Sequence, residues 1–363
     1  MRKVYVIYPG FYDFYNKNIT IGGIQTYIND LCDVLKIQYE VIVIQNGNQD
    51  ISIDINGYKI IQFGISSKHY KNGIAIRLNE LVQNDDLIIY ATDTLISKKI
   101  RFTKSIAIQH GVYWDIPDDG KQALFRKLIS KYLGTFRTIS RLDYVNKVIC
   151  VDNNFINWYR SQTNRLTDKL VSIPNYTRLS NSTIKNKDKI RIIFARRFYE
   201  YRGTKVFTNA ILALLNKQYN IEVIIAGDGP DEQWMKEQLR EFPQVSFIRY
   251  NSIDSLEIHR NVDIAVIPTV GSEGTSLSLL EAMASSCAII CTNVGGLTNI
   301  IIDEYNGIMI DAGNEVQLKI ALEKLINSEK LRMFLSSNAF NTVKFGFPYQ
   351  KWVNKWLEVI SNM

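Results

Sequence analysis

The chain has 363 residues, of which 46% are hydrophobic and 22% charged, a balance typical of globular domains that bury real cores. Its length favours two domains, and no apolar run reaches the roughly 18 residues that span a bilayer. The formal net charge of +7 suits an anionic substrate or a membrane surface as readily as a nucleic acid.

The first residues predict a buried strand. The apolar run in MRKVYVIYPG ends at Pro9–Gly10 and is far shorter than the core of a signal peptide. The four cysteines lack secretory context and metal-site spacing, so we expect reduced core residues in a cytoplasmic protein.

Both halves of the chain alternate short β-branched runs with helix-period segments, a pattern typical of parallel sheets buried on both faces. The predicted strands of the first half are VYVIY, EVIVIQN, DLIIYAT, SIAIQHG and KVICVD. Those of the second half are IRIIFARR, IEVIIAGDG, VSFIRY, VDIAVIPT, CAIICTN and NGIMID. Polar, aperiodic residues 177–190 separate the halves and predict a linker. We expect two Rossmann-like α/β domains with a cleft between them.

The last segment, FPYQKWVNKWLEVI, predicts a helix with Trp352 and Trp356 on one face. Its periodicity leaves open whether this helix packs on the second domain or crosses back to the first.

Glu273 lies between the strand VDIAVIPT and the helix pattern SLSLLEAMASS, at a strand's carboxyl end, where open α/β sheets bind ligands. Ser276 or Ser278 can cap the helix, which leaves the amides of its first turn free to bind an anion. The small residues Gly274, Thr275 and Ser276 allow a phosphate to approach the backbone. The alternative for Glu273 is a solvated loop carboxylate.

Glu281 lies inside the same predicted helix, so its carboxylate should be on the order of 10 Å from that of Glu273. That separation argues against a shared acid/base proton. The pattern Ser278-x-x-Glu281 is also a capping box, which stays open as the alternative to a ligand contact.

The connection ARRFYEYRGTK carries Arg197, Arg202 and Lys205 directly after a predicted strand. Guanidinium forks and an ammonium group suit a diphosphate. The strand-end position favours phosphate binding over the alternative, a solvated basic loop.

Two glycine turns also follow strands. AGDGP fails as a dinucleotide fingerprint, which would require a glycine where Glu232 stands. Gly22 and Gly23 predict either a helix-start turn or close approach of the backbone to a ligand phosphate.

His110 ends the strand SIAIQHG at the edge that faces the predicted cleft, and it is either structural or catalytic. The sequence has no Asp-x-Asp pair, no P-loop and no His/Cys cluster. We therefore expect a mechanism without a metal ion or another cofactor.

Residues 121–142 interleave basic side chains with Leu, Ile, Phe and Tyr. Such a basic amphipathic segment can make a peripheral contact with an anionic membrane. The alternative is a pair of surface helices that pack on the first domain.

Together these motifs resemble the retaining glycosyltransferases of family 4, the group 1 transferases with the GT-B architecture. FARRFYEYRGTK is similar to the family's Gly-Arg…Lys-Gly segment, and IIAGDGP to its glycine turn. SEGTSLSLLEAMASSCAIICTNVGGLTNII is similar to its block of two glutamates separated by seven residues. Gly22–Gly23, His110–Gly111 and IPNY at 173–176 occur in the matching order. The resemblance covers most of the chain and is strongest over 190–311.

The resemblance implies two doubly wound, Rossmann-like parallel-sheet domains that face each other across a cleft. The acceptor-binding domain would comprise residues 1–176 and about 347–363, with the C-terminal helix returning to it. Residues 177–190 would be the linker, and residues 191–346 would bind the donor.

Carried over residue by residue, the resemblance makes Glu273 a ligand of the donor sugar's hydroxyls and Glu281 a ligand of the ribose. The amides around Ser276 and Leu277 would hold the distal phosphate. The other donor-binding positions of the matched motifs are glycines and small residues: Gly22, Gly23, Gly227, Gly274 and Thr275.

The resemblance also makes Arg197 and Arg202 stabilise the departing diphosphate, while His110 contacts the sugar near the reacting centre. Three positions depart from the family pattern. Arg202 stands where lysine is usual, Arg196 where glycine is usual, and Asn299 where glutamate is frequent. These departures concern the donor more than the type of reaction.

The expected function is retaining, metal-independent transfer of a sugar from a nucleoside diphosphate sugar to a glycan or lipid-linked glycan, in surface polysaccharide biosynthesis. No nucleic-acid partner is expected, and the enzyme would act in the cytoplasm or at the inner face of the cell membrane. One alternative is a sugar-nucleotide epimerase of the same fold. Another is a non-catalytic subunit that binds a nucleotide sugar.

Overall fold

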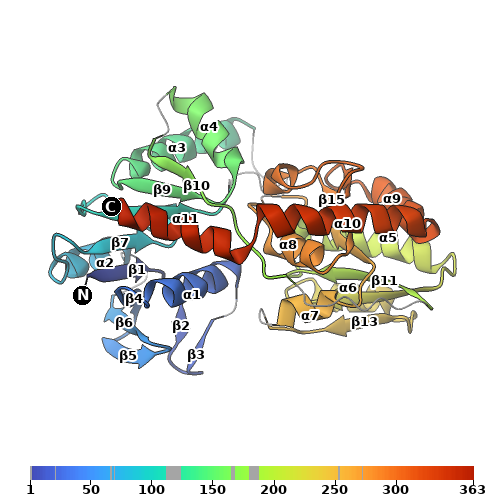
Figure 1. The fold of residues 1–363 in the computed structure, drawn as a ribbon, viewed down its shortest axis with the longest axis horizontal. Helices are drawn as coiled ribbons and strands as arrows, with labels where there is room; N and C mark the ends of the chain where they lie inside the picture. Colours follow the sequence, from blue (N-terminus) through green and yellow to red (C-terminus); the bar gives the residue numbers. More distant parts are fainter. Residues whose placement is uncertain are drawn as a thin grey trace. The chain divides into compact units, whose positions relative to one another are not determined.

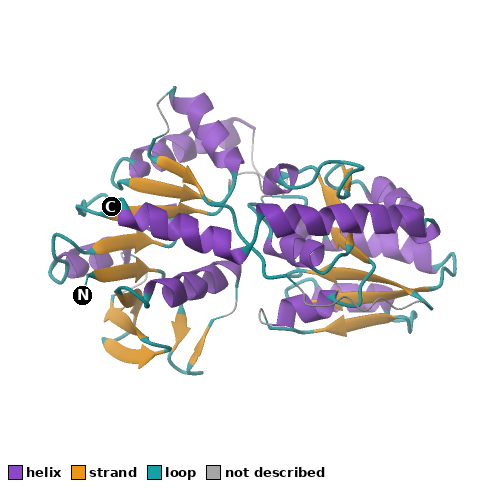
Figure 2. Cartoon of the chain, viewed as in Figure 1, coloured by secondary structure: helices purple, strands orange, loops and turns teal. Residues whose placement is uncertain are grey.

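The chain forms two compact units, each built on its own sheet (Figures 1 and 2). The computed structural model describes residues 2–20, 22–65, 68, 70–111, 124–164, 168–179, 188–251, 254–271 and 273–363. The first unit draws its described residues from Met1–His110, Gly120–Ile173 and Lys355–Met363. The second draws them from Gly111–Asp119 and Pro174–Asn354.

The first unit contains a sheet with the strand order β10-β9-β8-β7-β1-β4-β6-β5. Its strands are β1 (Lys3–Ile7), β4 (Glu40–Gly47), β5 (Ile51–Ile55), β6 (Tyr58–Gly64), β7 (Leu87–Tyr90), β8 (Ser105–Gln109), β9 (Lys147–Cys150) and β10 (Leu170–Ser172). A separate hairpin joins β2 (Tyr12–Asp13) and β3 (Asn18–Ile19). The helices are α1 (Gly23–Leu35), α2 (Tyr70–Asn79), α3 (Leu124–Leu142) and α4 (Asn153–Thr163), with the short η1 (Asp93–Leu95).

The sequence predicts a parallel sheet, but one pair of strands in this sheet is antiparallel. Strand β5 pairs antiparallel with β6, and the two are joined by Asn56 and Gly57 with φ values of 52° and 83°. Two positive φ angles in a two-residue turn match the twist of a hairpin, and Asn-Gly is the favoured pair for it. The strand prediction therefore missed an edge hairpin whose turn signal is present in the sequence.

The second unit contains a parallel sheet with the strand order β13-β12-β11-β14-β15-β16. Its strands are β11 (Ile190–Ala195), β12 (Ile221–Ala226), β13 (Val245–Ile248), β14 (Ile264–Ile267), β15 (Ala288–Thr292) and β16 (Ile308–Ile310). Its helices are α5 (Thr204–Leu215), α6 (Glu232–Leu239), α7 (Ser255–His259), α8 (Leu277–Ala284), α9 (Glu315–Asn327) and α10 (Glu329–Gly346). The short helices η3 (Glu200–Arg202) and η5 (Gly295–Asn299) follow β11 and β15.

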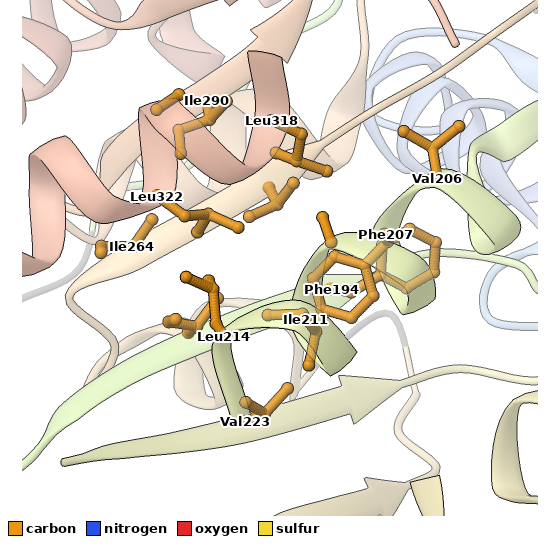
Figure 3. Packing of buried hydrophobic residues seen from close by; sticks show 14 of the residues in the cluster. Phe194, Val206, Phe207, Ile211, Leu214, Val223, Ile264, Ile290, Leu318 and Leu322 are labelled. Atoms are coloured by element: carbon orange, nitrogen blue, oxygen red, sulfur yellow. The ribbon is translucent and has the colours of Figure 1, made fainter. Parts of the chain in front are cut away.

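Strand alternation gives this second sheet a core on each face. Phe194 of β11 belongs to the core that includes residues of α5 and α9, whereas its neighbour Ile193 belongs to the core that includes residues of α8 and α10. Figure 3 shows the first of these cores, with Phe194 beside Phe207 of α5 and Leu322 on α9. The two phenylalanine rings have centroids 4.8 Å apart.

The last helix, α11 (Tyr349–Ser361), contributes to both units. In the second unit, the ring of Trp352 lies 4.3 Å from that of Tyr176, measured between centroids. In the first unit, Trp356 Nε1 donates a hydrogen bond to the Tyr27 hydroxyl at 2.8 Å. The two indoles thus anchor one helix in two cores.

The units divide after Ile173 and before Lys355, whereas the sequence placed the domain limits at 176 and about 347. Backbone pairing accounts for the difference, because Thr177 N donates to Phe347 O at 2.9 Å and Tyr349 N donates to Thr177 O at 3.1 Å. Of the predicted linker, residues 180–187 lie outside the described residues.

Two composition-based predictions can be compared with the folded chain. All four cysteines are free and buried, as expected for reduced core residues. Within the described part of the chain, no helix combines the length and the apolar composition that crossing a bilayer requires.

Gly203, which follows η3, brings the exit of β11 against β14. Its φ is 86°, and a Cβ there would lie 1.9 Å from the Pro268 carbonyl oxygen. Gly313 has a similar φ of 78°, but no atom lies within 4 Å of its Cβ position. Gly313→Ala should therefore cost about 1 kcal/mol of backbone strain, and Gly203→Ala about 1–3 kcal/mol more because backbone must move. Equal losses of stability in urea denaturation would contradict this close approach.

Candidate functional site

The candidate site lies where the strand order of the second sheet reverses. From the central strand β11, the chain adds β12 and β13 on one side and then β14, β15 and β16 on the other. Open parallel sheets bind ligands outside the carboxyl ends of their strands, at this switch in strand order. Here the switch lies between β11 and β14, so the residues that follow these two strands define the site.

The centre of the site is the buried carboxylate of Glu273, which is 9% exposed. Arg196 and Arg202, both from the exit of β11, each donate from a guanidinium nitrogen to Glu273 Oε2. Thr269 Oγ1 donates to the same oxygen at 3.0 Å and accepts from Arg196 at 2.7 Å. Residues that follow two neighbouring strands thus form one ionic cluster, called here the Glu273 cluster.

The cluster stays ionised in the interior. Burial by itself would raise the pKa of the Glu273 carboxyl, but the charges of Arg196 and Arg202 outweigh burial and hold this pKa below its usual value. Burial lowers the pKa of the Arg196 guanidinium, and the charge of Glu273 opposes that shift. Arginine remains protonated in proteins, so one carboxylate faces two cations.

The two oxygens of Glu273 differ in their surroundings. Arg196, Arg202 and Thr269 all donate to Oε2. Among the described residues, none donates a hydrogen bond to Oε1. An ionised carboxylate offers about four acceptor sites. Oε1 can therefore accept hydrogen bonds from the hydroxyl groups of a ligand.

The backbone of the Glu273 loop is held by close packing and by an amide. Gly296 N donates to Glu273 O at 2.8 Å. A Cβ on Gly295 would lie 2.1 Å from that carbonyl oxygen, so the glycine is required for packing. Asn175 Nδ2 donates to Thr275 O at 2.6 Å. These contacts fix the loop between β14 and α8.

Helix α8 begins after Ser276, whose hydroxyl accepts a hydrogen bond from Leu279 N at 3.4 Å. Ser276 is therefore the cap, and the capping-box interpretation of Ser278 and Glu281 is wrong because Ser278 lies inside the helix. The amides of Leu277 and Ser278 belong to the first turn, where amides have no acceptor within the helix. With the helix dipole they can bind an anion.

Glu281 lies farther along α8, near Ser255 of α7. Burial raises the pKa of Glu281 to about 7, although the Ser255 side chain acts in the opposite direction. Burial raises the pKa of Tyr250, and the charge of Glu281 raises it further by a smaller amount, while the charge of Arg196 lowers it. Tyr250 is thus sensitive to both Glu281 and the Glu273 cluster.

The other predicted cations after β11 have different surroundings. Arg197 is exposed, and Lys205 pairs with Glu200 at 3.0 Å on the surface. Of the adjacent Arg196 and Arg197, the residue that contacts Glu273 is Arg196, one of the positions that depart from the family pattern. Neighbouring residues of an extended chain point in opposite directions, so only one of two adjacent arginines can enter the cluster. A diphosphate contact for Arg197 stays a prediction.

Gly227 is explained by packing. Its φ is 140°, and a Cβ there would lie 2.0 Å from the Arg196 carbonyl oxygen. Gly229 has the same role beside Phe198, whose carbonyl oxygen would lie 2.6 Å from an added Cβ. The exit of β12 therefore supports the exit of β11, and a donor contact of Gly227 stays a prediction.

The paired glycines of the first unit open α1, which begins at Gly23 with Gly22 as its cap. Gly22 has an extended backbone with a φ of 165°. A Cβ there would meet the flexible end of the Gln25 side chain, at 2.3 Å. Neither backbone strain nor rigid packing demands this glycine, and close approach of a ligand phosphate to Gly22 and Gly23 stays a prediction.

His110 is held in one tautomer. Its Nε2 lies 2.8 Å from Ala91 O, and its ring meets that of Tyr27 edge-on with centroids 5.5 Å apart. Burial lowers the pKa of His110 to about 4, against the effect of the Ala91 bond. The ring is therefore neutral near pH 7. Because a carbonyl can only accept, Nε2 carries the proton and Nδ1 is an acceptor.

Sequence reasoning missed Arg196 and Thr269 as members of the site. Both follow strands that end at the switch point. A buried ion pair between two strand exits requires knowing which strands are neighbours, and the order β11-β14 is known only from the fold.

Residues 175–342, which contain the whole Glu273 cluster and Glu281, match the family described as glycosyl transferases group 1. Over these residues the chain is similar to the group 1 glycosyltransferases. The whole chain is 24% identical over 403 aligned residues to an uncharacterized glycosyltransferase of Methanocaldococcus jannaschii, with 100% of both chains covered.

One further sequence relative and one solved structure are similar to this chain. The capsular polysaccharide biosynthesis glycosyltransferase CapM of Staphylococcus aureus is 26% identical over 167 residues, which cover 45% of this chain and 43% of CapM. The structure of Anabaena HepE in complex with UDP has a TM-score of 0.75 at 13% identity and covers 100% of both chains. This likeness confirms the predicted fold class, two Rossmann-like domains of the GT-B type.

The raised pKa of Glu281 predicts a specific pH dependence of stability. The folded chain binds this proton more tightly than the unfolded chain, whose carboxyl titrates near its usual value of 4.5. Stability therefore falls as pH rises from about 4.5 to about 7. Glu281→Gln removes this loss, so its melting temperature relative to wild type should be higher at about pH 8 than at about pH 5.

The matched control is Glu358→Gln, which changes an exposed carboxylate of α11. Its melting temperature relative to wild type should be the same at both pH values. An equal difference for Glu281→Gln at the two pH values would show that this carboxyl titrates normally.

Proposed function

We propose that the chain is a retaining, metal-independent glycosyltransferase of family 4 that moves a sugar from a nucleoside diphosphate sugar to a glycan or lipid-linked glycan. The observation that carries the proposal is the Glu273 cluster, a buried carboxylate with one oxygen fixed by cations, beside the start of α8. Glu273 Oε1 can accept from sugar hydroxyls. The amides of Leu277 and Ser278 can hold a phosphate, and Glu281 can accept from ribose hydroxyls.

The charges of the second unit suit the bond that breaks. Cleavage of the anomeric bond builds negative charge on the departing nucleoside diphosphate. Arg202 and the first-turn amides of α8 place positive charge at the same strand ends, and such preorganised electrostatic stabilisation is usually the largest catalytic contribution. These groups supply the neutralisation that a divalent cation gives in other transferases, which supports the metal-independent mechanism.

The state of His110 suits a contact with the sugar better than proton transfer. With a pKa of about 4 it is neutral at cellular pH, so it does not act as a general acid. Its Nδ1 can accept a hydrogen bond from a donor hydroxyl. In retention by front-face attack, the leaving phosphate would then help to deprotonate the acceptor.

The relatives support a role in surface polysaccharide biosynthesis. CapM is named for capsular polysaccharide biosynthesis, and HepE was solved with UDP. We infer that the donor is a nucleoside diphosphate sugar, with a uridine diphosphate as the first candidate. The acceptor would be a growing surface glycan, and the enzyme would act in the cytoplasm at the inner face of the membrane.

Helix α3 supports a peripheral contact with that membrane. It exposes a row of large apolar side chains at helical spacing, namely Phe125, Ile129, Tyr132, Leu133 and Phe136. Exposed Lys131 and Arg137 lie on the same helix. An apolar face next to cations is the arrangement that binds an anionic bilayer surface. Residues 121–123 of the predicted basic segment lie outside the described residues.

A donor screen tests the proposed function. UDP-, GDP-, dTDP- and CMP-linked sugars are compared by thermal shift, because a bound ligand raises the melting temperature. The stabilising donor should then release its nucleoside diphosphate in the presence of glycan acceptor and EDTA, and the product linkage should keep the anomeric configuration. Epimerised donor without acceptor would indicate the epimerase, and binding without turnover the non-catalytic subunit.

Glu273→Gln tests the assignment of the sugar-binding carboxylate. The amide keeps the shape but loses the charge that holds the arginines, so turnover should fall by about 100-fold or more. Glu200→Gln is the matched control, because this carboxylate is 68% exposed and pairs with Lys205 on the surface. Equal activity of the two variants would exclude Glu273 from the site.

Vesicle binding tests α3. Phe125→Ser with Phe136→Ser should abolish sedimentation with vesicles of phosphatidylglycerol, while donor turnover in solution is retained. Phe345→Ser is the matched control, because Phe345 of α10 is 71% exposed, close to the 72% of Phe125. Sedimentation of the double variant at the wild-type level would refute the membrane contact.

A further inference from the structure

The Glu273 cluster holds its two arginines in different ways. The side chain of Arg196 is 4% exposed and also donates to Thr269, so both ends of its guanidinium fork are occupied. The side chain of Arg202 is 26% exposed, and its guanidinium lies over the ring of Tyr201, 5.0 Å from the centroid. One arginine is therefore fixed in the interior and the other lies at its edge.

We propose that Arg196 is a positioning residue that serves as the permanent counter-ion of Glu273, whereas Arg202 is exchangeable and moves to the donor diphosphate. The second half of this inference rests on the proposed function, which supplies the diphosphate. The first half concerns the folded chain alone and holds with or without a donor.

Removal of one partner from a buried ion pair is strongly destabilising, because the remaining charge is left without compensation. If Arg202 were the only counter-ion, its transfer to a phosphate would impose that penalty on Glu273. Arg196 removes the penalty, since it keeps Oε2 occupied while Arg202 leaves. The orientation of Oε1 toward the sugar is then independent of the diphosphate.

The support of Arg196 extends into the sheet. Thr269, which accepts from Arg196 and donates to Glu273, is itself fully buried. Thr292 Oγ1 of β15 donates to Thr269 O at 2.6 Å. Three neighbouring strand exits, those of β11, β14 and β15, thus hold the Arg196 side of the carboxylate. Arg202, in contrast, is the last residue of the short helix η3.

Double-mutant cycles in urea denaturation test the permanent contact without any ligand. One cycle combines Arg196→Met with Glu273→Gln, and the matched cycle combines Arg202→Met with Glu273→Gln. Contacting residues give non-additive effects. We expect Arg196→Met to lower the denaturation midpoint more than Arg202→Met, and Glu273→Gln to recover a large part of the loss that Arg196→Met causes. Additive losses in the Arg196 cycle would overturn the inference.

The same cycles with saturating UDP, GDP or dTDP test the exchange. A bound diphosphate should remove most of the non-additivity between Arg202 and Glu273 and leave that between Arg196 and Glu273 unchanged. Equal weakening of both would overturn the division of roles. If none of the three diphosphates shifts the midpoint, the proposed function fails, and the ligand-free cycles still decide the role of Arg196.

Arg196→Lys tests whether a positive charge beside Glu273 is sufficient without the guanidinium fork. Lysine keeps the cation but loses the fork that reaches Thr269 and Glu273 together. It should restore most of the donor affinity that Arg196→Met loses, because a charge remains beside the carboxylate. If Arg196→Met does not fold, non-additivity between Arg196→Lys and Glu273→Gln gives the same test, and additivity there would overturn the inference.

Discussion

The architecture of the second unit depends on the neutralisation of one buried charge. A carboxylate in a protein interior is stable only with cations or donors placed on it in advance. For Glu273 the two cations follow a different strand, β11, so the ionic cluster can exist only if β11 and β14 are neighbours. The strand order therefore does two things at once. It creates the reversal where a ligand can enter, and it brings the two exits close enough to share a charge.

The same constraint explains why glycines crowd these loops. Side chains of the cluster fill the space between strand exits, so the supporting backbones must approach one another without a Cβ. Gly203, Gly227 and Gly295 each place their Cα against a carbonyl oxygen of a neighbouring exit. In such a site a glycine can be essential without touching the ligand. In this fold, the glycine turns of the matched motifs largely allow the backbones around the ionic cluster to approach one another closely.

The sequence predicted much of this arrangement and failed at identifiable points. β-branched runs located the strands of the second sheet, and the strand ends located Glu273 and the start of α8. Local rules could not choose between Arg196 and Arg197, because the choice depends on which side chain points toward β14. They could not choose between Ser276 and Ser278 as the cap, since both fit the pattern and the backbone turn decides. The hairpin at Asn56-Gly57 is within reach of local rules, because its turn signal lies in two adjacent residues.

The helix α11 has a consequence for how such enzymes can be rebuilt. Its first turns belong to the second unit, with Trp352 against Tyr176, and its later turns to the first, with Trp356 bonded to Tyr27. A chimera that exchanges the second unit as one contiguous cassette would therefore cut a helix with an indole in each core. A chimera that preserves both cores keeps Trp356 of this chain in the first unit, and its incoming second unit has to pack against Trp352. In recombination between relatives, the final helix must therefore be compatible with units from both parents.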